Sequence, residues 1–233
     1  LTTGPAVKAF EEALCEYTGA RYAVAVNTGT AGLHAAVAAA GIGPGDEVIV
    51  PAISFAASSN CVLYQGGTPV FADLDPRTLG LDPVDVARKI TKKTKAVVAV
   101  DYAGHPCDYD ALDEIAKAHG LPIIEDGAHA LGAEYKGRKV GTLQDFTMLS
   151  FHPVKHVTTA EGGAVLTDSA DLDKKMRSFR HHGIDLDLHA RGKNQGWAYD
   201  VLQLGYNYRI PDLNCALGRS QLQKAGKWPP RRT

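Results

Sequence analysis

The 233-residue sequence lacks long hydrophobic runs and has almost no net charge. No apolar stretch approaches the roughly 20 residues that a membrane-spanning helix needs, so no membrane association is expected. The 25 basic and 26 acidic side chains nearly cancel, and the chain therefore has no overall field that favours nucleic acid. These absences predict a soluble, cytoplasmic protein that binds neither membranes nor nucleic acid.

Fingerprints for metals and nucleotides are also missing. The four cysteines lie far apart and form no C-x-x-C pair, which is typical of reduced thiols and gives no zinc site. The stretch "GIGPGD" does not have G-x-G-x-x-G spacing, and no G-x-x-x-x-G-K-[ST] motif occurs. We therefore predict no metal, and a nucleotide-binding Rossmann module becomes a weak alternative.

Short apolar runs alternate with amphipathic stretches, and this repeated β-α-β pattern dominates residues 22–126. The runs are apolar on both faces, as in parallel strands that helices cover on each side. The pattern predicts an α/β fold with a mostly parallel, doubly wound sheet, whose ligands bind beyond the carboxyl ends of the strands. The strand candidates are "YAVAVN", "DEVIVPA", "TPVFADL", "AVVAVDY" and "LPIIED".

Three signals fall at that edge of the predicted sheet. "NTGT" opens a helix at Thr30 and Ala31, where free N–H groups attract phosphate, although a hydroxyl there is more often only a cap. Asp126 ends an apolar strand with His129 close behind it, but Asp126 could simply cap the next turn. Lys155 lies in "HPVKH" between two strands, and a loop lysine is usually solvated. Each signal alone is weak.

Together the three signals match the requirements of pyridoxal phosphate. This cofactor needs a lysine for its Schiff base, an acid for its pyridine nitrogen and a helix start for its phosphate. Lys155 would be nucleophilic only when deprotonated, so a buried or cationic setting should lower its pKa. The combination predicts a pyridoxal phosphate site.

Nearly the whole chain resembles the DegT/DnrJ/EryC/StrS sugar aminotransferases, which are pyridoxal-phosphate enzymes of fold type I. These enzymes aminate keto sugars attached to a nucleotide. The resemblance lies in "LTTGP", "AVAVNTGTAGLHAA", "GPGDEVIVPAISFAASSN", "GGTPVFADLDP", "IIEDGAHALGAEYKGRKVG", "SFHPVKHVTTAEGGAVLT", "RHHG" and "LGYNYRIPDLNCALGRSQL".

The resemblance implies catalytic and ring-binding roles for four side chains. Lys155 would form the Schiff base and later move a proton between the substrate carbon and the cofactor. Asp126 would pair with the pyridine nitrogen, Phe55 would stack on the ring, and His129 would lie against it. The alternative for Phe55 is an ordinary core position.

The resemblance also implies a phosphate site and a partner subunit. The backbone of Thr30 and Ala31, with Ser150, would hold the phosphate. Asn207 matches an asparagine that family members extend to the partner's cofactor, which implies a homodimer with shared active sites. The alternative for Asn207 is a turn former.

Within the family, "YAGHPCDYDAL" and "SFHPVKHVTTAEGG" look most similar to the aminotransferases of pseudaminic-acid biosynthesis. That similarity implies transfer of an amino group from glutamate to C4 of a UDP-linked 4-keto-6-deoxy amino sugar. Another nucleotide-sugar aminotransferase is the alternative. A sugar-deoxygenating branch, which has histidine in place of the lysine, is disfavoured by Lys155.

The two ends of the chain depart from the family pattern. We expect a cofactor-binding large domain over residues 1–224 and an aberrant tail over residues 225–233, where family members continue into a small C-terminal domain. The chain also begins at Leu1 and not at a methionine. These departures suggest a fragment that lacks the small domain, and they leave a non-catalytic remnant that binds the cofactor as a further alternative.

Overall fold

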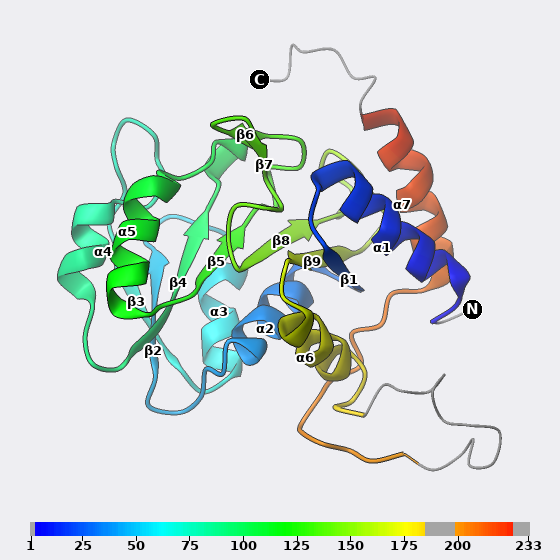
Figure 1. The fold of residues 1–233 in the computed structure, drawn as a ribbon, viewed down its shortest axis with the longest axis horizontal. Coiled ribbons are helices and arrows are strands. Elements are labelled where there is room, and N and C mark those ends of the chain that lie inside the picture. Colours follow the sequence, from blue (N-terminus) through cyan, green and yellow to red (C-terminus); the bar gives the residue numbers. More distant parts are fainter. Residues whose placement is uncertain (1–2, 185–198, 226–233) are drawn as a thin grey trace.

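The computed structural model describes residues 3–184 and 199–225, which form a central sheet with helices on both faces (Figure 1). The strands are β1 (Tyr22–Val26), β2 (Glu47–Pro51), β3 (Thr68–Ala72), β4 (Thr94–Val100), β5 (Ile123–Asp126), β6 (Glu134–Tyr135), β7 (Arg138–Lys139), β8 (Phe146–Ser150) and β9 (Gly163–Thr167). The helices are α1 (Pro5–Thr18), α2 (Gly29–Ala39), α3 (Ala57–Tyr64), α4 (Pro83–Lys89), the 3₁₀ turn η1 (Tyr102–Gly104), α5 (Tyr109–His119), α6 (Ala170–Arg180) and α7 (Asp212–Ala225).

Seven strands of the described residues form one sheet in the order β1-β9-β8-β5-β4-β2-β3, and β6 pairs with β7 in a separate hairpin. Five neighbouring strands run parallel, namely β3, β2, β4, β5 and β8, whereas β9 is antiparallel to both β8 and β1. The predicted mostly parallel α/β sheet is therefore confirmed. The exception is β9, which follows β8 after a loop at residues 151–162 that contains no helix, whereas a parallel return usually needs a crossover helix.

Helices cover both faces of the sheet and enclose two apolar layers. One layer packs side chains of α2, α3 and α6 against the strands, and the other packs side chains of α1, α4, α5 and α7. Alternate residues of the buried strands point to opposite layers, so Ile123 joins the second layer and Ile124 the first. The same alternation places the side chains of Glu125 and Asp126 on opposite faces of β5.

Local sequence signals explain where the helices near the sheet edge begin and end. Thr28 caps α2, where its hydroxyl accepts a hydrogen bond from the Ala31 N–H at 3.0 Å. Asp108 caps α5 in the same way, and Gly120 ends that helix in the left-handed conformation, with φ of 64°. Both caps direct helix starts toward the carboxyl ends of the parallel strands.

The described residues cover most of the predicted large domain. Residues 226–233, nearly all of the predicted tail, lie outside them, so the division at residue 224 stays a prediction. None of the described helices is long and apolar enough to cross a membrane.

Candidate active site

Asp126 lies at the carboxyl end of β5, at the edge where the sequence predicts a ligand. Its side chain is buried, with the Ser58 hydroxyl donating to Oδ2 at 2.7 Å and the Ala128 N–H donating to Oδ1 at 3.2 Å. Ser58 in turn lies 2.6 Å from the Ser54 hydroxyl. Burial raises the pKa of Asp126, while these donors and the positive charges of His129 and Lys155 oppose the rise.

Lys155 lies in the loop between β8 and β9 and faces the same edge. The loop is held by Phe151 and Val157, which are fully buried, and the Lys155 N–H donates to the His152 carbonyl at 2.9 Å. Partial burial lowers the pKa of the Lys155 ammonium group, and the negative charge of Asp126 opposes that shift. A lower pKa increases the fraction of nucleophilic amine near neutral pH.

His129 and Lys155 line one cavity of about 200 Å³, together with Ala103, Val154 and His156. His129 is largely exposed, and the pKa of its imidazole is lowered first by partial desolvation and then by the charge of Lys155. The structure therefore brings together three of the predicted site residues, Asp126, His129 and Lys155. They come from two loops that are far apart in the sequence.

The start of α2 forms a tight backbone cradle against β8 and β9. A Cβ at Gly163 would lie 2.7 Å from the Gly29 nitrogen, and a Cβ at Gly29 would lie 3.3 Å from the Ser150 hydroxyl oxygen. Ser150 thus stands beside the first turn, as the phosphate prediction requires. The first-turn N–H of Thr30 has no partner within the helix. The N–H of Ala31, by contrast, already donates to Thr28 Oγ1, which competes with its predicted phosphate contact.

Phe55 and Asn207 are both exposed, and the structure does not join either to Lys155. The Phe55 side chain is 78% exposed beyond the carboxyl end of β2, so the alternative of a core position is wrong. Asn207 pairs with His181 in a β-bridge between two segments that lie outside the sheet. Asn207 does not line the cavity that contains His129 and Lys155.

Sequence reasoning missed the support behind these side chains. Ser58 and Ser54 were not singled out, although "SFAASSN" follows a strand and offers hydroxyl donors to the neighbouring loops. The acid before Asp126, Glu125, was also missed, although an acid inside an apolar run is a signal that it must find buried partners.

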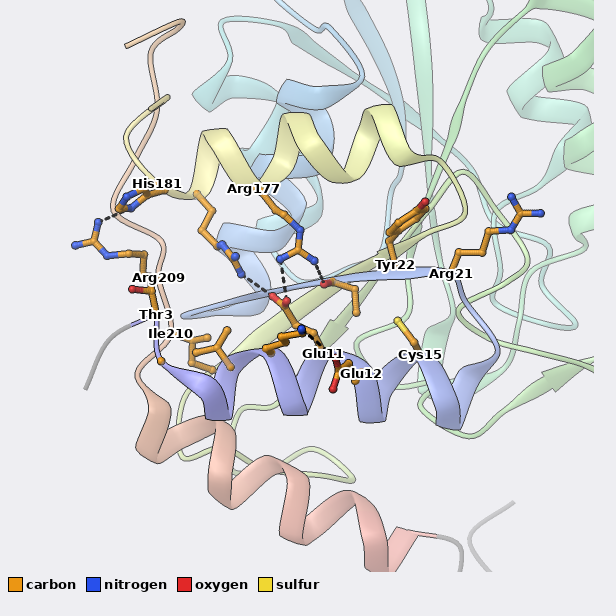
Figure 2. Close-up of a pocket in the computed structure, with 15 residues that line it drawn as sticks. Thr3, Glu11, Glu12, Cys15, Arg21, Tyr22, Arg177, His181, Arg209 and Ile210 are labelled. Atoms are coloured by element: carbon orange, nitrogen blue, oxygen red, sulfur yellow. Dashed lines mark hydrogen bonds and ion pairs between the residues drawn. The ribbon is translucent and has the colours of Figure 1, made fainter. Parts of the chain in front are cut away.

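A larger cavity of about 670 Å³ lies between α1, β1 and α6 and contains none of the predicted site residues (Figure 2). Figure 2 shows Glu11 of α1 facing Arg177 of α6, and the two are joined at 2.8 Å. Arg180 contacts the other Glu11 oxygen at 2.8 Å, and the Ala25 N–H donates to the same oxygen at 2.9 Å. Asp173 also pairs with Arg177, at 2.9 Å, so two carboxylates face the two guanidinium groups.

The described residues contain no group of three or more His, Cys, Asp or Glu side chains arranged to hold a metal ion. The four cysteines are free. The chemistry of the candidate site therefore depends on the lysine, the buried acid and the helix start.

The mostly parallel α/β sheet has the fold of the pyridoxal-phosphate-dependent aminotransferases. Comparison with known proteins agrees, because residues 1–233 match the DegT/DnrJ/EryC1/StrS aminotransferase family. The chain belongs to that family.

Three similar proteins illustrate the relationship. MJ1066 of Methanocaldococcus jannaschii, an uncharacterized protein, is 42% identical over 226 residues, which are 97% of this chain and 58% of MJ1066. PseC of Helicobacter pylori, an aminotransferase involved in the biosynthesis of pseudaminic acid, is 37% identical with a TM-score of 0.88, over 97% of this chain and 60% of PseC. Spr1654 of Streptococcus pneumoniae, assigned as a sugar aminotransferase and solved in its PLP form, is 34% identical with a TM-score of 0.88, over 97% of this chain and 61% of Spr1654. The chain thus spans about three fifths of the length of each relative.

Proposed function

We propose that this protein is a pyridoxal-phosphate-dependent aminotransferase that acts on nucleotide-linked keto sugars. The observation that carries the proposal is the placement of Lys155, Asp126 and the start of α2 at one edge of the sheet. Membership of the aminotransferase family and the PLP form of Spr1654 support the choice of cofactor. When bound, this cofactor supplies an electron sink for the carbon that carries the amino group.

The residues present fit that cofactor. The Gly29–Gly163 cradle leaves no room for side chains where the backbone would approach a phosphate, with Thr30 and Ser150 beside it. Ala31 would take part only if the Thr28 cap shares its N–H. Phe55, exposed above the edge, is free to cover a ring face, and His129 would lie against the ring from the Lys155 side.

The roles proposed for Lys155 and Asp126 agree with the opposite directions of their pKa shifts. Lys155 would attach the cofactor covalently, and its Nζ, once released, would accept the proton from the substrate carbon that bears the amino group and pass it to the aldehyde carbon of the cofactor. Asp126 would face the pyridine nitrogen. A cation at that point would stabilise its carboxylate against the desolvation that raises its pKa, while Ser58 keeps the carboxylate oriented.

For the substrates, we propose glutamate as amino donor and a UDP-linked 4-keto-6-deoxy amino sugar as acceptor, as in pseudaminic-acid biosynthesis. The support is the likeness to PseC and the two stretches "YAGHPCDYDAL" and "SFHPVKHVTTAEGG". Another sugar nucleotide and a non-catalytic remnant are the competing proposals. We further propose a cytoplasmic homodimer in which Asn207, exposed in this chain, reaches the partner's cofactor.

The cofactor assignment is tested by absorbance spectroscopy. Wild-type protein mixed with pyridoxal phosphate should show the visible absorbance of a protein-bound cofactor, and Lys155→Ala should lose it. Lys95→Ala, which alters an exposed lysine on β4, should retain it. Identical spectra for Lys155→Ala and wild type would rule out the role of Lys155.

The reaction is tested by turnover. Formation of 2-oxoglutarate from glutamate, dependent on a UDP-linked 4-keto sugar, is expected for the proposed enzyme. Cofactor binding without any turnover would favour the remnant. Turnover only with a different sugar nucleotide would correct the substrate and leave the reaction class intact.

A further inference from the structure

Two acidic side chains lie close together on the face of the sheet opposite to Asp126. Glu125 of β5 and Asp101, just beyond β4, are both fully buried, and their carboxyl groups lie within hydrogen-bonding reach of each other. Glu125 pairs across the sheet with Thr147 of β8, whereas Asp126 pairs with Met148. Three buried carboxyl groups, those of Asp101, Glu125 and Asp126, therefore lie next to one another at the proposed site.

The hydrogen-bond donors near the pair contact one oxygen of each carboxyl group and leave the other oxygen without a partner. The Tyr109 hydroxyl and the Cys107 N–H donate to Asp101 Oδ1 at 2.7 Å and 3.2 Å. The Thr147 hydroxyl donates to Glu125 Oε2. The remaining oxygens, Asp101 Oδ2 and Glu125 Oε1, are buried and accept no hydrogen bond from any described residue. One proton between these two oxygens would satisfy both.

We propose that Asp101 and Glu125 share one proton and act as a positioning pair for Asp126. Two ionised carboxylates in contact would repel each other strongly in a buried setting, whereas a shared proton leaves one negative charge and one short hydrogen bond. The direction of the pKa shifts agrees, because burial raises the pKa of Asp101 to about 6 and, with the charge of Asp101, raises that of Glu125 well above its usual value.

The groups that face the pair supply no positive charge that could replace the proton. Tyr109 of α5 stays neutral because burial raises its pKa well above the usual value, and burial raises the pKa of Cys107 to about 12. Thr147 is neutral, and Asp126 adds a negative charge that further favours protonation of Asp101. A retained proton would therefore neutralise one of the two carboxylates.

The pair also connects two loops of the proposed site. The Asp101 N–H donates to the Asp126 carbonyl at 3.1 Å, and the Asp101 carbonyl accepts from the Gly104 N–H at 3.0 Å. Gly104, with φ of 87°, approaches so closely that a Cβ would lie 2.7 Å from the His129 carbonyl oxygen. These backbone contacts hold the segment that carries Ala103 against the Asp126–His129 loop, and a hydrogen bond to Glu125 would hold Asp101 in place for them. This positioning role rests on the proposed function, whereas the shared proton does not.

The proton is tested by infrared spectroscopy of the cofactor-free protein at pH 7. Wild type should show the carbonyl band of a protonated carboxyl group, and Glu125→Gln should lose it, since the amide keeps the hydrogen bond and the total charge. Asp126→Asn should keep the band, which excludes Asp126 as its source. Glu114→Gln, at an exposed position of α5, is the matched control. A wild-type spectrum without the band, or a Glu125→Gln spectrum that keeps it, would overturn the proposal.

Unfolding at several pH values provides an independent measurement. A carboxyl group whose pKa is raised by folding binds a proton that the unfolded chain releases, so stability falls as pH rises above about 4.5. The unfolding constant of wild type, divided by that of Glu125→Gln, should rise about tenfold per pH unit between pH 5 and 7. A ratio that is independent of pH would contradict a retained proton.

Cofactor affinity tests the positioning role. Glu125→Leu leaves the Asp101 carboxylate without its partner and should raise the dissociation constant for pyridoxal phosphate at least tenfold. Glu125→Gln should stay within about threefold of wild type. Equal affinities for all three proteins would overturn the positioning role. If wild type itself binds no pyridoxal phosphate, the proposed function fails, while the infrared result still decides the shared proton.

Discussion

Two clusters of charged residues in this protein are built in opposite ways. In the cluster around Glu11, the guanidinium groups of Arg177 and Arg180 face two carboxylates, Glu11 at 2.8 Å and Asp173 at 2.9 Å, and both arginines also donate to backbone carbonyls of β1. At the candidate active site, Asp126 has hydroxyl and N–H donors, and within residues 3–184 and 199–225 neither Asp126 nor Lys155 forms a salt bridge. The first cluster is electrostatically complete, and the second is not.

The difference separates structural charges from reactive ones. Complete pairing lets Glu11 join α1, β1 and α6. Burial lowers the pKa of Lys155 and raises that of Asp126, and a cofactor that contributes a cation and an aldehyde would relieve both. Of the two clusters, the one around Glu11 lines the larger cavity, at about 670 Å³ against about 200 Å³.

The largest expected effect comes from breaking the complete cluster. Glu11→Ala would leave Arg180, whose side chain is 11% exposed, without a carboxylate and would leave Arg177 with Asp173 alone, and it should cost about 3–5 kcal/mol of unfolding free energy. Urea denaturation measures the change. Glu12→Ala, on the same helix with a 65% exposed side chain, should cost under about 0.5 kcal/mol. Similar losses for the two variants would show that the ion pairs add little.

Next in size is overfilling the cradle at the start of α2. Gly163→Ala places a methyl group 2.7 Å from the Gly29 nitrogen and should destabilise the fold by about 1–3 kcal/mol. It should also weaken cofactor binding, because the helix start must move. Gly43→Ala, where no atom lies within 4 Å of the added carbon, serves as control in the same thermal unfolding and cofactor titration. Unchanged cofactor affinity in Gly163→Ala would show that the cradle does not form the phosphate site.

A smaller effect is expected from the donor to Asp126. Ser58→Ala removes the 2.7 Å hydrogen bond to a buried carboxyl group and should cost about 1.5 kcal/mol. The pKa of Asp126 should rise further, since the carboxylate loses a stabilising donor. Denaturation and an NMR titration of Asp126 measure the two effects. Ser59→Ala, whose hydroxyl contacts only the Ala56 carbonyl at 3.1 Å, should leave the pKa of Asp126 unchanged.

The smallest effect on stability is expected at Phe55. Because this ring is 78% exposed, Phe55→Ala should change the unfolding free energy by less than about 0.5 kcal/mol. Loss of ring stacking should nevertheless weaken pyridoxal phosphate binding about fivefold. Loss of stability without loss of affinity would contradict a role in holding the cofactor.

Much of the fold and part of the site could be predicted from the sequence. Runs that are apolar at every position, without the alternation of a half-exposed strand, indicated buried parallel strands, and they placed Asp126 at the carboxyl end of one of them, as observed. Lys155 required the coincidence of three signals. The Asp101–Glu125 pair could not be predicted, because it depends on the stagger between β4 and β5. The competition between the Thr28 cap and a phosphate for the Ala31 N–H could not be predicted either, because it depends on a side-chain rotamer.

The central claim is that Lys155 is the amine that holds pyridoxal phosphate. Borohydride reduction of the protein mixed with the cofactor, followed by peptide mass spectrometry, tests it most directly. We predict that a single peptide containing Lys155 carries the added pyridoxyl mass, and that exposed lysines such as Lys95 carry none. Modification scattered over exposed lysines, with the Lys155 peptide unmodified, would contradict the account.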